Sequence, residues 1–207
     1  PFLAGRDIKR YEQPEASKYI ILFKNGGTAE RFGELPEDKA EARMHEAFPA
    51  VMAHLHNHRT KARARYDQGQ YWWELRACDY YEAFERAKIV WPETSGDMQF
   101  TQVDPGIYLN KTTFNIPGDH LALLAVLNSS LSSFFFDHTV SKMRGGYFSM
   151  SKVYVETFPV PSFTEEQTDQ LTQLAQRALN EPAHRSAIEA QIDQVVYVAF
   201  GLGEEEV

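Results

Sequence analysis

Apolar positions between Leu121 and Phe136 follow the spacing of a helix with one buried face. They recur at steps of three and four residues as far as Leu131, and three consecutive phenylalanines then extend the apolar surface. We therefore expect one rigid helix in this part of the chain, anchored in the core.

The segment after this helix is polar and basic. No acid occurs between Asp137 and Glu156, and a glycine pair at 145–146 frees the backbone for unusual dihedral angles. The bases of this stretch are Lys142, Arg144 and Lys152. The pattern predicts a flexible cationic loop presented by a rigid helix.

Several other segments have strand patterns. KYIILF at 18–23 is one of them, and the Asn-Gly-Gly sequence after it would turn the chain. Four β-rich runs follow at 88–91, 98–103, 106–110 and 112–116, separated by Pro, Gly and Asp. We expect the last four to form a small, twisted, mostly antiparallel sheet.

Helices are expected on both sides of these strands. Pro36 precedes a helix over 37–47, and Pro49 begins a second helix that runs through Arg65. A short helix is expected over 79–86.

The C-terminal segment has the clearest helix signals. Thr164 and Gln167 form a capping-box pattern before an apolar stripe, Pro182 interrupts this helix, and a second helix ends at Gly201. The fold class expected is α/β in the α+β sense: a small, mostly antiparallel sheet flanked by helices, with a C-terminal antiparallel helical pair.

Composition narrows the class of protein. With 207 residues, 43% hydrophobic content and no run of 18 apolar residues, the chain is expected to be globular, with one or two domains and no membrane span. The single cysteine, Cys78, cannot form an internal disulfide, which fits the cytoplasm as the expected compartment. Because the chain begins at Pro1 and shows no leader sequence, we expect it to be a piece of a longer protein.

The charge is unevenly distributed. The net charge of -8 disfavours nucleic-acid binding, but residues 164–207 carry nine acids and two bases, while residues 1–163 are close to neutral. Residues 54–65 hold four bases, three histidines and no acid. One face could therefore meet a duplex while the acidic end points elsewhere.

Motifs for catalysis or metal binding are missing from the sequence. The common restriction nucleases need an acid followed by Glu-x-Lys, and Glu85-Arg-Ala-Lys88 has the wrong spacing. No Gly-x-Ser-x-Gly elbow, phosphate-binding loop or Gly-x-Gly-x-x-Gly turn occurs. His54, His56 and His58 could bind a metal, but no nearby Cys or Glu completes a set, so no metal site is expected.

The four bases at 59–65 alternate along the predicted helix. Arg59 and Arg63 would lie on one side, with Lys61 and Arg65 on nearly the opposite side, so one phosphate track can use only one of the two pairs. The YWW run that follows could stack on bases, but at least one of its tryptophans is expected in the core.

Six segments stand in a fixed order along nearly the whole chain. They are PFLAGRDIKRY near the start, WWELR at 72–76, KIVWPETS at 88–95, LLAVLNSSLSSFFF, RGGYFSMSKVYVETFPVP and the closing IDQVVYVAFGL. Together they resemble the TaqI-like C-terminal specificity domain of adenine-specific DNA methyltransferases and of fused type II restriction-modification enzymes.

The resemblance implies that different parts of the chain and of its parent protein have different functions. Residues 1–163 would form a target-recognition domain that grips duplex DNA beside a methyltransferase and reads its bases, and residues 164–207 a helical appendage or spacer. Catalysis would lie in an N-terminal part of the parent chain, because the Asn-Pro-Pro-Tyr type motif that holds the flipped adenine is missing here. No cofactor is expected in this piece; S-adenosylmethionine, and magnesium if a nuclease is fused, are implied for the parent protein.

In such a domain phosphate contacts position the protein, while a few polar side chains read base edges. The first choice for DNA contact is the loop from Lys142 to Lys152, because an arginine can make a bidentate contact and glycines let backbone amides approach a phosphate. The candidates in this loop are Lys142, Arg144, Gly145, Gly146, Tyr147, Ser149 and Lys152. Secondary candidates are Arg76, Lys111, Thr112, Thr113, Arg59 and Arg63, and Arg6 and Arg10 lie where the chain would enter from the catalytic domain.

The expected partners are double-stranded DNA and the N-terminal methyltransferase domain of the same parent chain. Two alternatives stay open. The loop could be an exposed turn whose charge serves solubility, or the chain could be a protein-interaction or spacer domain whose acidic helical pair docks a methyltransferase, nuclease or phage-defence partner.

Overall fold

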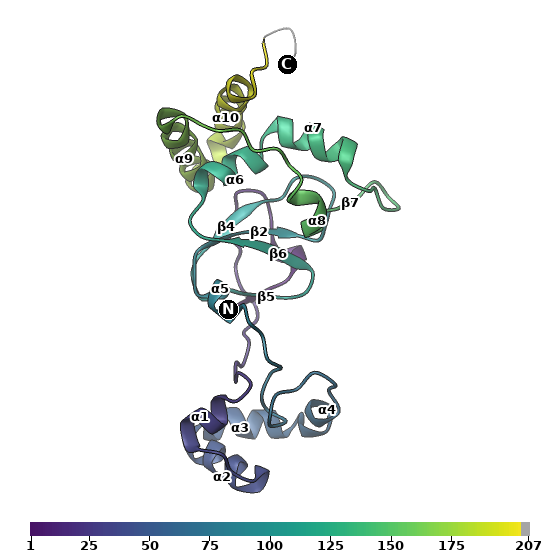
Figure 1. Ribbon diagram of the computed structural model, residues 1–207, viewed down its shortest axis with the longest axis vertical. Helices are drawn as coiled ribbons and strands as arrows, with labels where there is room; N and C mark the ends of the chain where they lie inside the picture. Colours follow the sequence, from purple (N-terminus) through teal and green to yellow (C-terminus); the bar gives the residue numbers. More distant parts are fainter. Residues whose placement is uncertain (204–207) are drawn as a thin grey trace. The chain divides into compact units, whose positions relative to one another are not determined.

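The computed structural model describes residues 1–203, which form two compact units (Figure 1). The helical unit is Ile20–Tyr81, and the sheet unit combines Pro1–Tyr19 with the chain from Glu82 onward. Small antiparallel sheets flanked by helices confirm the predicted mixed α/β class.

The sheet unit is built around one central strand. β2 (Lys88–Pro92) pairs antiparallel with β4 (Thr101–Val103) on one side and β6 (Thr113–Pro117) on the other. All five residues of β2 are buried, as expected for a strand covered on both faces. The predicted antiparallel sheet is therefore confirmed for the runs at 88–91, 98–103 and 112–116, with the first of them at its centre. The run at 106–110 was wrongly placed in this sheet, because its residues 108–109 pair with the first residues of the chain instead.

Two short strand pairs extend this arrangement. β1 (Phe2–Leu3) runs parallel to β5 (Tyr108–Leu109), and β3 (Thr94–Ser95) runs antiparallel to β7 (Phe148–Ser149). The second pair joins the strand after β2 to a segment more than fifty residues later, which attaches the predicted cationic loop to the sheet.

Side-chain alternation along β2 divides the core into two layers. Ile89 and Trp91 belong to the larger core with α6 and the C-terminal helices, whereas Val90 packs with Leu3 and Ile8 of the N-terminal segment. The sheet thus separates the helices from the first residues of the chain.

Lys88 is fully buried at the start of β2. Its amine donates hydrogen bonds to the backbone oxygens of Phe84 (3.0 Å), Arg86 (2.8 Å) and Asp104 (3.3 Å), and burial lowers its pKa to about 8. These bonds tie the end of the short helix α5 (Tyr81–Phe84) to the sheet.

The single helix predicted after the sheet is two helices. α6 (Leu121–Leu127) and α7 (Ser130–Thr139) meet at a bend of 58°. At the bend, the Asn128 side chain donates to the backbone oxygen of Phe100 at 2.9 Å and accepts from its N–H at 3.2 Å, while Ser129 caps the first turn of α7. The buried amide therefore serves the sheet rather than a continuous helix.

No single helix among residues 1–203 is long and apolar enough to cross a membrane, and α6 and α7 meet that length and composition only as a bent pair. Four residues of α6, from Leu124 to Leu127, are buried in the core of the sheet unit.

The predicted C-terminal helical pair is confirmed. Thr164 and Gln167 form the capping box, with the two bonds at 3.2 and 2.9 Å, and Gly201 ends the pair in the left-handed region at φ 72°. The helices are α9 (Glu165–Asn180) and α10 (Arg185–Phe200), with a 3-10 turn at Pro182–His184 between them.

The helical pair packs into the sheet unit. α9 lies along α6, and α10 contacts both α6 and α7 (Figure 1). Leu171 and Ile188 share one core with Trp91. The division into compact units therefore separates Ile20–Tyr81 from the rest of the described chain. The predicted boundary between a recognition domain (1–163) and a helical appendage (164–207) is a functional one and stays a prediction.

The helical unit has a core of its own. Tyr71, Trp72 and Trp73 are buried with Met44 and Met52, and the Tyr71 and Trp73 rings stack at 4.9 Å. Both tryptophans are therefore core residues, which confirms the expectation for at least one. The helices around them are α1 (Gly27–Phe32), α2 (Glu37–Ala47), α3 (Pro49–His56) and α4 (Arg59–Arg63).

Two predictions for this unit were wrong in detail. Residues 20–23 form no strand: the preceding Lys18 makes one isolated bridge to Phe2, Tyr19 is 77% exposed, and the Phe23 oxygen accepts a single backbone bond from the Leu75 N–H at 2.8 Å. The helix predicted from Pro49 to Arg65 is interrupted at residues 57–58, between α3 and α4. The helix predicted over 37–47 is confirmed as α2.

Candidate nucleic-acid interface

The cationic loop, here called the basic tip (residues 142–152), ends in a tight turn. The Gly146 N–H donates to the Met143 oxygen at 3.1 Å, and Gly145 and Gly146 have φ angles of 92° and 82°. The position before the closing residue of such a turn requires positive φ, which glycine adopts without strain. The unusual dihedral angles that the sequence indicated at this glycine pair are present.

The base of the basic tip is fixed to the core. β7 pairs with β3, the Met150 N–H donates to the Glu93 oxygen at 2.7 Å, and the buried Trp91 indole N–H donates to the Met150 oxygen at 2.7 Å. Phe148 and Met150 are buried, while Tyr147 between the turn and Phe148 is 50% exposed. Only the outer turn of the loop is therefore free of the sheet.

Two acids that flank the loop in the sequence form ion pairs with its lysines and compensate part of its positive charge. Lys142 pairs with Asp137 at 2.8 Å, and this hydrogen bond lowers the pKa of the Asp137 carboxyl. Lys152 pairs with Glu156 at 3.7 Å across one helical turn, in an exposed position. The tip is less cationic than the acid-free stretch of sequence suggested.

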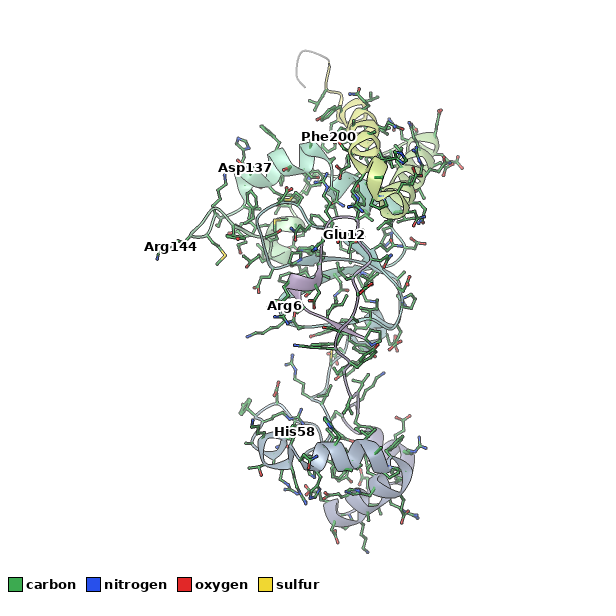
Figure 2. The ribbon with its side chains drawn as sticks, turned by 180° about the vertical axis from the view of Figure 1, so that it is seen from behind. Arg6, Glu12, His58, Asp137, Arg144 and Phe200 are labelled. Carbon is green, nitrogen blue, oxygen red and sulfur yellow. The ribbon has the colours of Figure 1, made fainter. Side chains whose placement is uncertain are left out.

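Arg144 differs from these two lysines. It is exposed, and among residues 1–203 no hydrogen bond or ion pair is recorded for its side chain. Figure 2 shows it at the outer end of the loop, pointing away from the body of the sheet unit. Its guanidinium is free to make a bidentate contact with a phosphate or with the acceptor edge of guanine.

Tyr147 follows directly after this turn. Its ring is in van der Waals range of Gly145 and Gly96, where an added Cβ would sit 3.5 and 3.7 Å from ring atoms. The two glycines thus leave room for the Tyr147 ring to lie against the backbone, while Tyr147 remains 50% exposed. Ser149, next on the same face of the strand, is half buried opposite Thr94, and its N–H donates to the Ser141 oxygen.

A second group of predicted residues forms the turn between β5 and β6. The Asn110 side-chain oxygen accepts from the Thr112 N–H (3.0 Å), the Thr112 hydroxyl (2.7 Å) and the Thr113 hydroxyl (3.2 Å). The Gly5 N–H donates to the Thr112 hydroxyl at 3.1 Å. Both threonine hydroxyls therefore already have partners within the protein, whereas Lys111 is exposed. Base contact by the two threonines stays a prediction.

Backbone bonds link this turn to the basic tip. The backbone oxygen of Thr112 accepts from the Glu93 N–H at 2.9 Å, and the backbone oxygen of Glu93 accepts from the Met150 N–H. On its other side Thr112 lies against Gly5, where a Cβ would come within 2.6 Å of the Thr112 oxygen. The link through Glu93 could not be read from the sequence, because it depends on the pairing of β3 with β7.

Five exposed cations of the sheet unit lie at or next to this series of contacts. Arg6 follows Gly5 with a side chain that is 74% exposed, and Figure 2 shows it on the same side of the sheet unit as Arg144. We call the set the basic edge: Arg6, Lys111, Lys142, Arg144 and Lys152.

The predicted arginines of α4 lie in the helical unit and already have partners. Arg59 donates to Glu41 at 2.8 Å with its guanidinium 5.5 Å from the Trp72 ring centre, and Arg63 pairs with Glu37. Both arginines reach acids of α2, so they share one side of α4 as the spacing predicts. Their charge is compensated, and phosphate contact by this pair stays a prediction.

Two more predicted arginines have different surroundings. Arg76 is exposed in the helical unit. Arg10 donates to the Glu189 carboxylate and to the backbone oxygen of Asn128, each at 2.6 Å, so it ties the N-terminal segment to α10 and to the bend between α6 and α7.

Fold and site define a class: a mixed α/β domain in which a short strand pair, anchored in the core, presents an exposed cationic turn. The chain belongs to the family of TaqI-like C-terminal specificity domains, which matches residues 1–160. The resemblance indicated by the sequence segments is confirmed.

One solved structure with a similar fold is the type IIL restriction-modification enzyme MmeI in complex with DNA. The identity is 17% and the TM-score 0.53, over 57% of this chain and 19% of the MmeI chain. This chain therefore matches about a fifth of that enzyme's length, and at this identity the likeness concerns the fold. No curated protein matches the chain.

Proposed function

We propose that this chain recognises double-stranded DNA in a sequence-specific way within a restriction-modification protein, and that it positions the target for a catalytic domain elsewhere in its parent. The observation that carries the proposal is the placement of Arg144. Its exposed guanidinium is held at the end of a turn whose base is hydrogen-bonded to the core through Met150. Membership of a specificity-domain family supports the same conclusion.

The proposed mechanism has two parts. Arg6 and the three lysines of the basic edge contact phosphates, which sets the position of the domain on the duplex without reading sequence. Arg144 then reaches a base edge in the major groove, where a bidentate contact to guanine distinguishes it from the other bases. Because the base of the tip is already ordered, little conformational entropy is lost when the turn binds.

We further propose that the chemistry lies in other parts of the parent protein. The parent would be a DNA adenine methyltransferase that uses S-adenosylmethionine, with magnesium required if a nuclease is fused. The family is described as a C-terminal specificity domain, and the similar structure is a restriction-modification enzyme several times longer than this chain. The methyltransferase domain would then be the neighbour of this chain, and the cytoplasm its compartment.

Salt dependence of duplex binding tests the proposal. With about four phosphates contacted by the basic edge, the logarithm of the association constant should fall with the logarithm of salt concentration with a slope of about −4. Fluorescence anisotropy of a labelled duplex of about 30 base pairs, titrated with the chain at salt concentrations from about 50 to 200 mM, measures this slope.

Two results would contradict the proposal: no binding at the lowest salt, or binding that does not respond to salt. If the chain binds a methyltransferase or nuclease partner but no duplex at low salt, it acts as a protein-interaction or spacer domain instead.

A further inference from the structure

The helical unit brings together three side chains that the sequence keeps apart. Glu41 and His45 are four residues apart on α2, so they share one face of that helix, and His56 is the last residue of α3. One ligand atom from each lies within 4.8 Å of the other two, and the Glu41 Oε1 atom is 3.6 Å from His56 Nδ1. Around His56 the sequence itself offers no carboxylate; the contact between α2 and α3 supplies it.

We infer that Glu41, His45 and His56 form a binding site for a divalent transition-metal ion of the zinc class. Two imidazole nitrogens and one carboxylate oxygen are a donor set that zinc accepts, whereas magnesium and calcium prefer oxygen donors alone. Ligands about 2.0 to 2.2 Å from a tetrahedral ion are roughly 3.3 to 3.5 Å apart. The three atoms therefore need to approach by little more than an ångström, which side-chain rotation can supply.

Arg59 orients the carboxylate for this role. It donates to Glu41 Oε2 at 2.8 Å and lies over the Trp72 ring, which leaves Oε1 as the oxygen near His56. Hydrogen bonds from outer groups commonly fix the orientation of metal ligands in this way. The two oxygens of Glu41 thus serve different partners, and binding of an ion does not require the ion pair with Arg59 to break.

The site has a closed side and an open side. The Glu41 side chain is 12% exposed and the Trp72 ring lies edge-on to His56 at 6.5 Å, whereas the His56 side chain is 51% exposed. A water molecule can therefore reach the fourth position of a tetrahedral ion from the solvent side.

The size of the helical unit gives such an ion a structural role. A unit of this length, Ile20–Tyr81, buries a small core, and small domains often gain stability from a metal. An ion held by α2 and α3 would join these helices directly. This role is independent of the proposed DNA recognition, whose basic edge lies in the sheet unit.

His54 and His58 provide a matched control. Their rings are 5.1 Å apart and both residues are exposed, yet no carboxylate or third histidine within residues 1–203 completes a group with them. They bracket His56 in the sequence and belong to the same helical unit.

Isothermal titration of the 207-residue chain with zinc chloride, and with magnesium chloride in parallel, tests the inference. We expect one zinc ion per chain, no magnesium binding, and a zinc affinity at least about tenfold lower in His56→Gln and in His45→Gln. The double variant His54→Gln, His58→Gln should bind zinc as the unchanged chain does. Circular dichroism confirms that each variant is folded, and zinc should raise the melting temperature of the unchanged chain but not of His56→Gln.

Cobalt substitution gives a second measurement of the same site. Visible absorption bands of a tetrahedral cobalt complex should appear with the unchanged chain and be lost in His56→Gln. The inference is overturned if the unchanged chain binds no zinc, if zinc affinity is unchanged in both His45→Gln and His56→Gln, or if the His54, His58 double variant loses the ion.

Discussion

Replacement of Trp91 by alanine is expected to lower the free energy of unfolding by about 3 to 5 kcal/mol. The side chain is 3% exposed and packs between Phe100 and Phe114, with ring centres 5.5 and 5.8 Å away. Its removal leaves a cavity in the larger core and the Met150 oxygen without its indole donor. Urea denaturation followed by circular dichroism measures the change.

Trp91→Phe separates packing from the hydrogen bond. This variant keeps an aromatic ring against Phe100 and Phe114 but cannot donate to Met150, so we expect a smaller loss of roughly 1 to 3 kcal/mol. An ordinary surface substitution changes the free energy of unfolding by at most about 0.5 kcal/mol. If the free energy of unfolding of Trp91→Ala lies within that range of the unchanged chain, the anchoring of the tip described above is contradicted.

Replacement of Arg144 by alanine is expected to weaken duplex binding by about 1 to 3 kcal/mol, roughly five- to 150-fold in dissociation constant. The loss should concern binding alone, because the side chain is exposed and has no recorded partner among residues 1–203. Stability should change by less than about 0.5 kcal/mol, as for other exposed positions. Anisotropy titration at fixed salt and urea denaturation of the same preparation measure the two quantities.

Arg177→Ala is the matched control for this variant. It removes the same charge from an exposed position in the last turn of α9, where Arg177 pairs with Glu181. Equal effects of Arg144→Ala and Arg177→Ala on duplex affinity would mean that net charge, and not the basic tip, determines binding.

Elements governed by local chemistry could be predicted from the sequence. The capping box at Thr164 and the apolar run of β2 depend on neighbours within a few residues, and both were predicted correctly. The bend at Asn128 could not be predicted in this way, because its partner Phe100 lies 28 residues earlier, just before β4. The segment at 18–23 likewise has the composition of a strand, but its only bridge is the isolated one from Lys18 to Phe2 of β1.

In the candidate site, too, the features that depend on neighbouring residues could be predicted and those that depend on distant residues could not. The need for glycine at Gly145 is local to the turn, so the sequence indicates it. The pairing of Lys142 with Asp137 requires the chain to fold back after α7. The acids that hold Arg59 and Arg63 lie on a different helix. Sequence thus predicted a glycine-containing basic loop, and only the fold distinguishes Arg144 from Lys142, Arg59 and Arg63, which already have partners.

Selection of bound duplexes from a random pool, with the intact parent protein at a salt concentration near 150 mM, tests the central claim most directly. We expect a short sequence to be enriched, and we expect Arg144→Ala to lose the preference at one position while keeping it at the others. A pool that remains as random after selection as before it would contradict sequence-specific recognition by this domain.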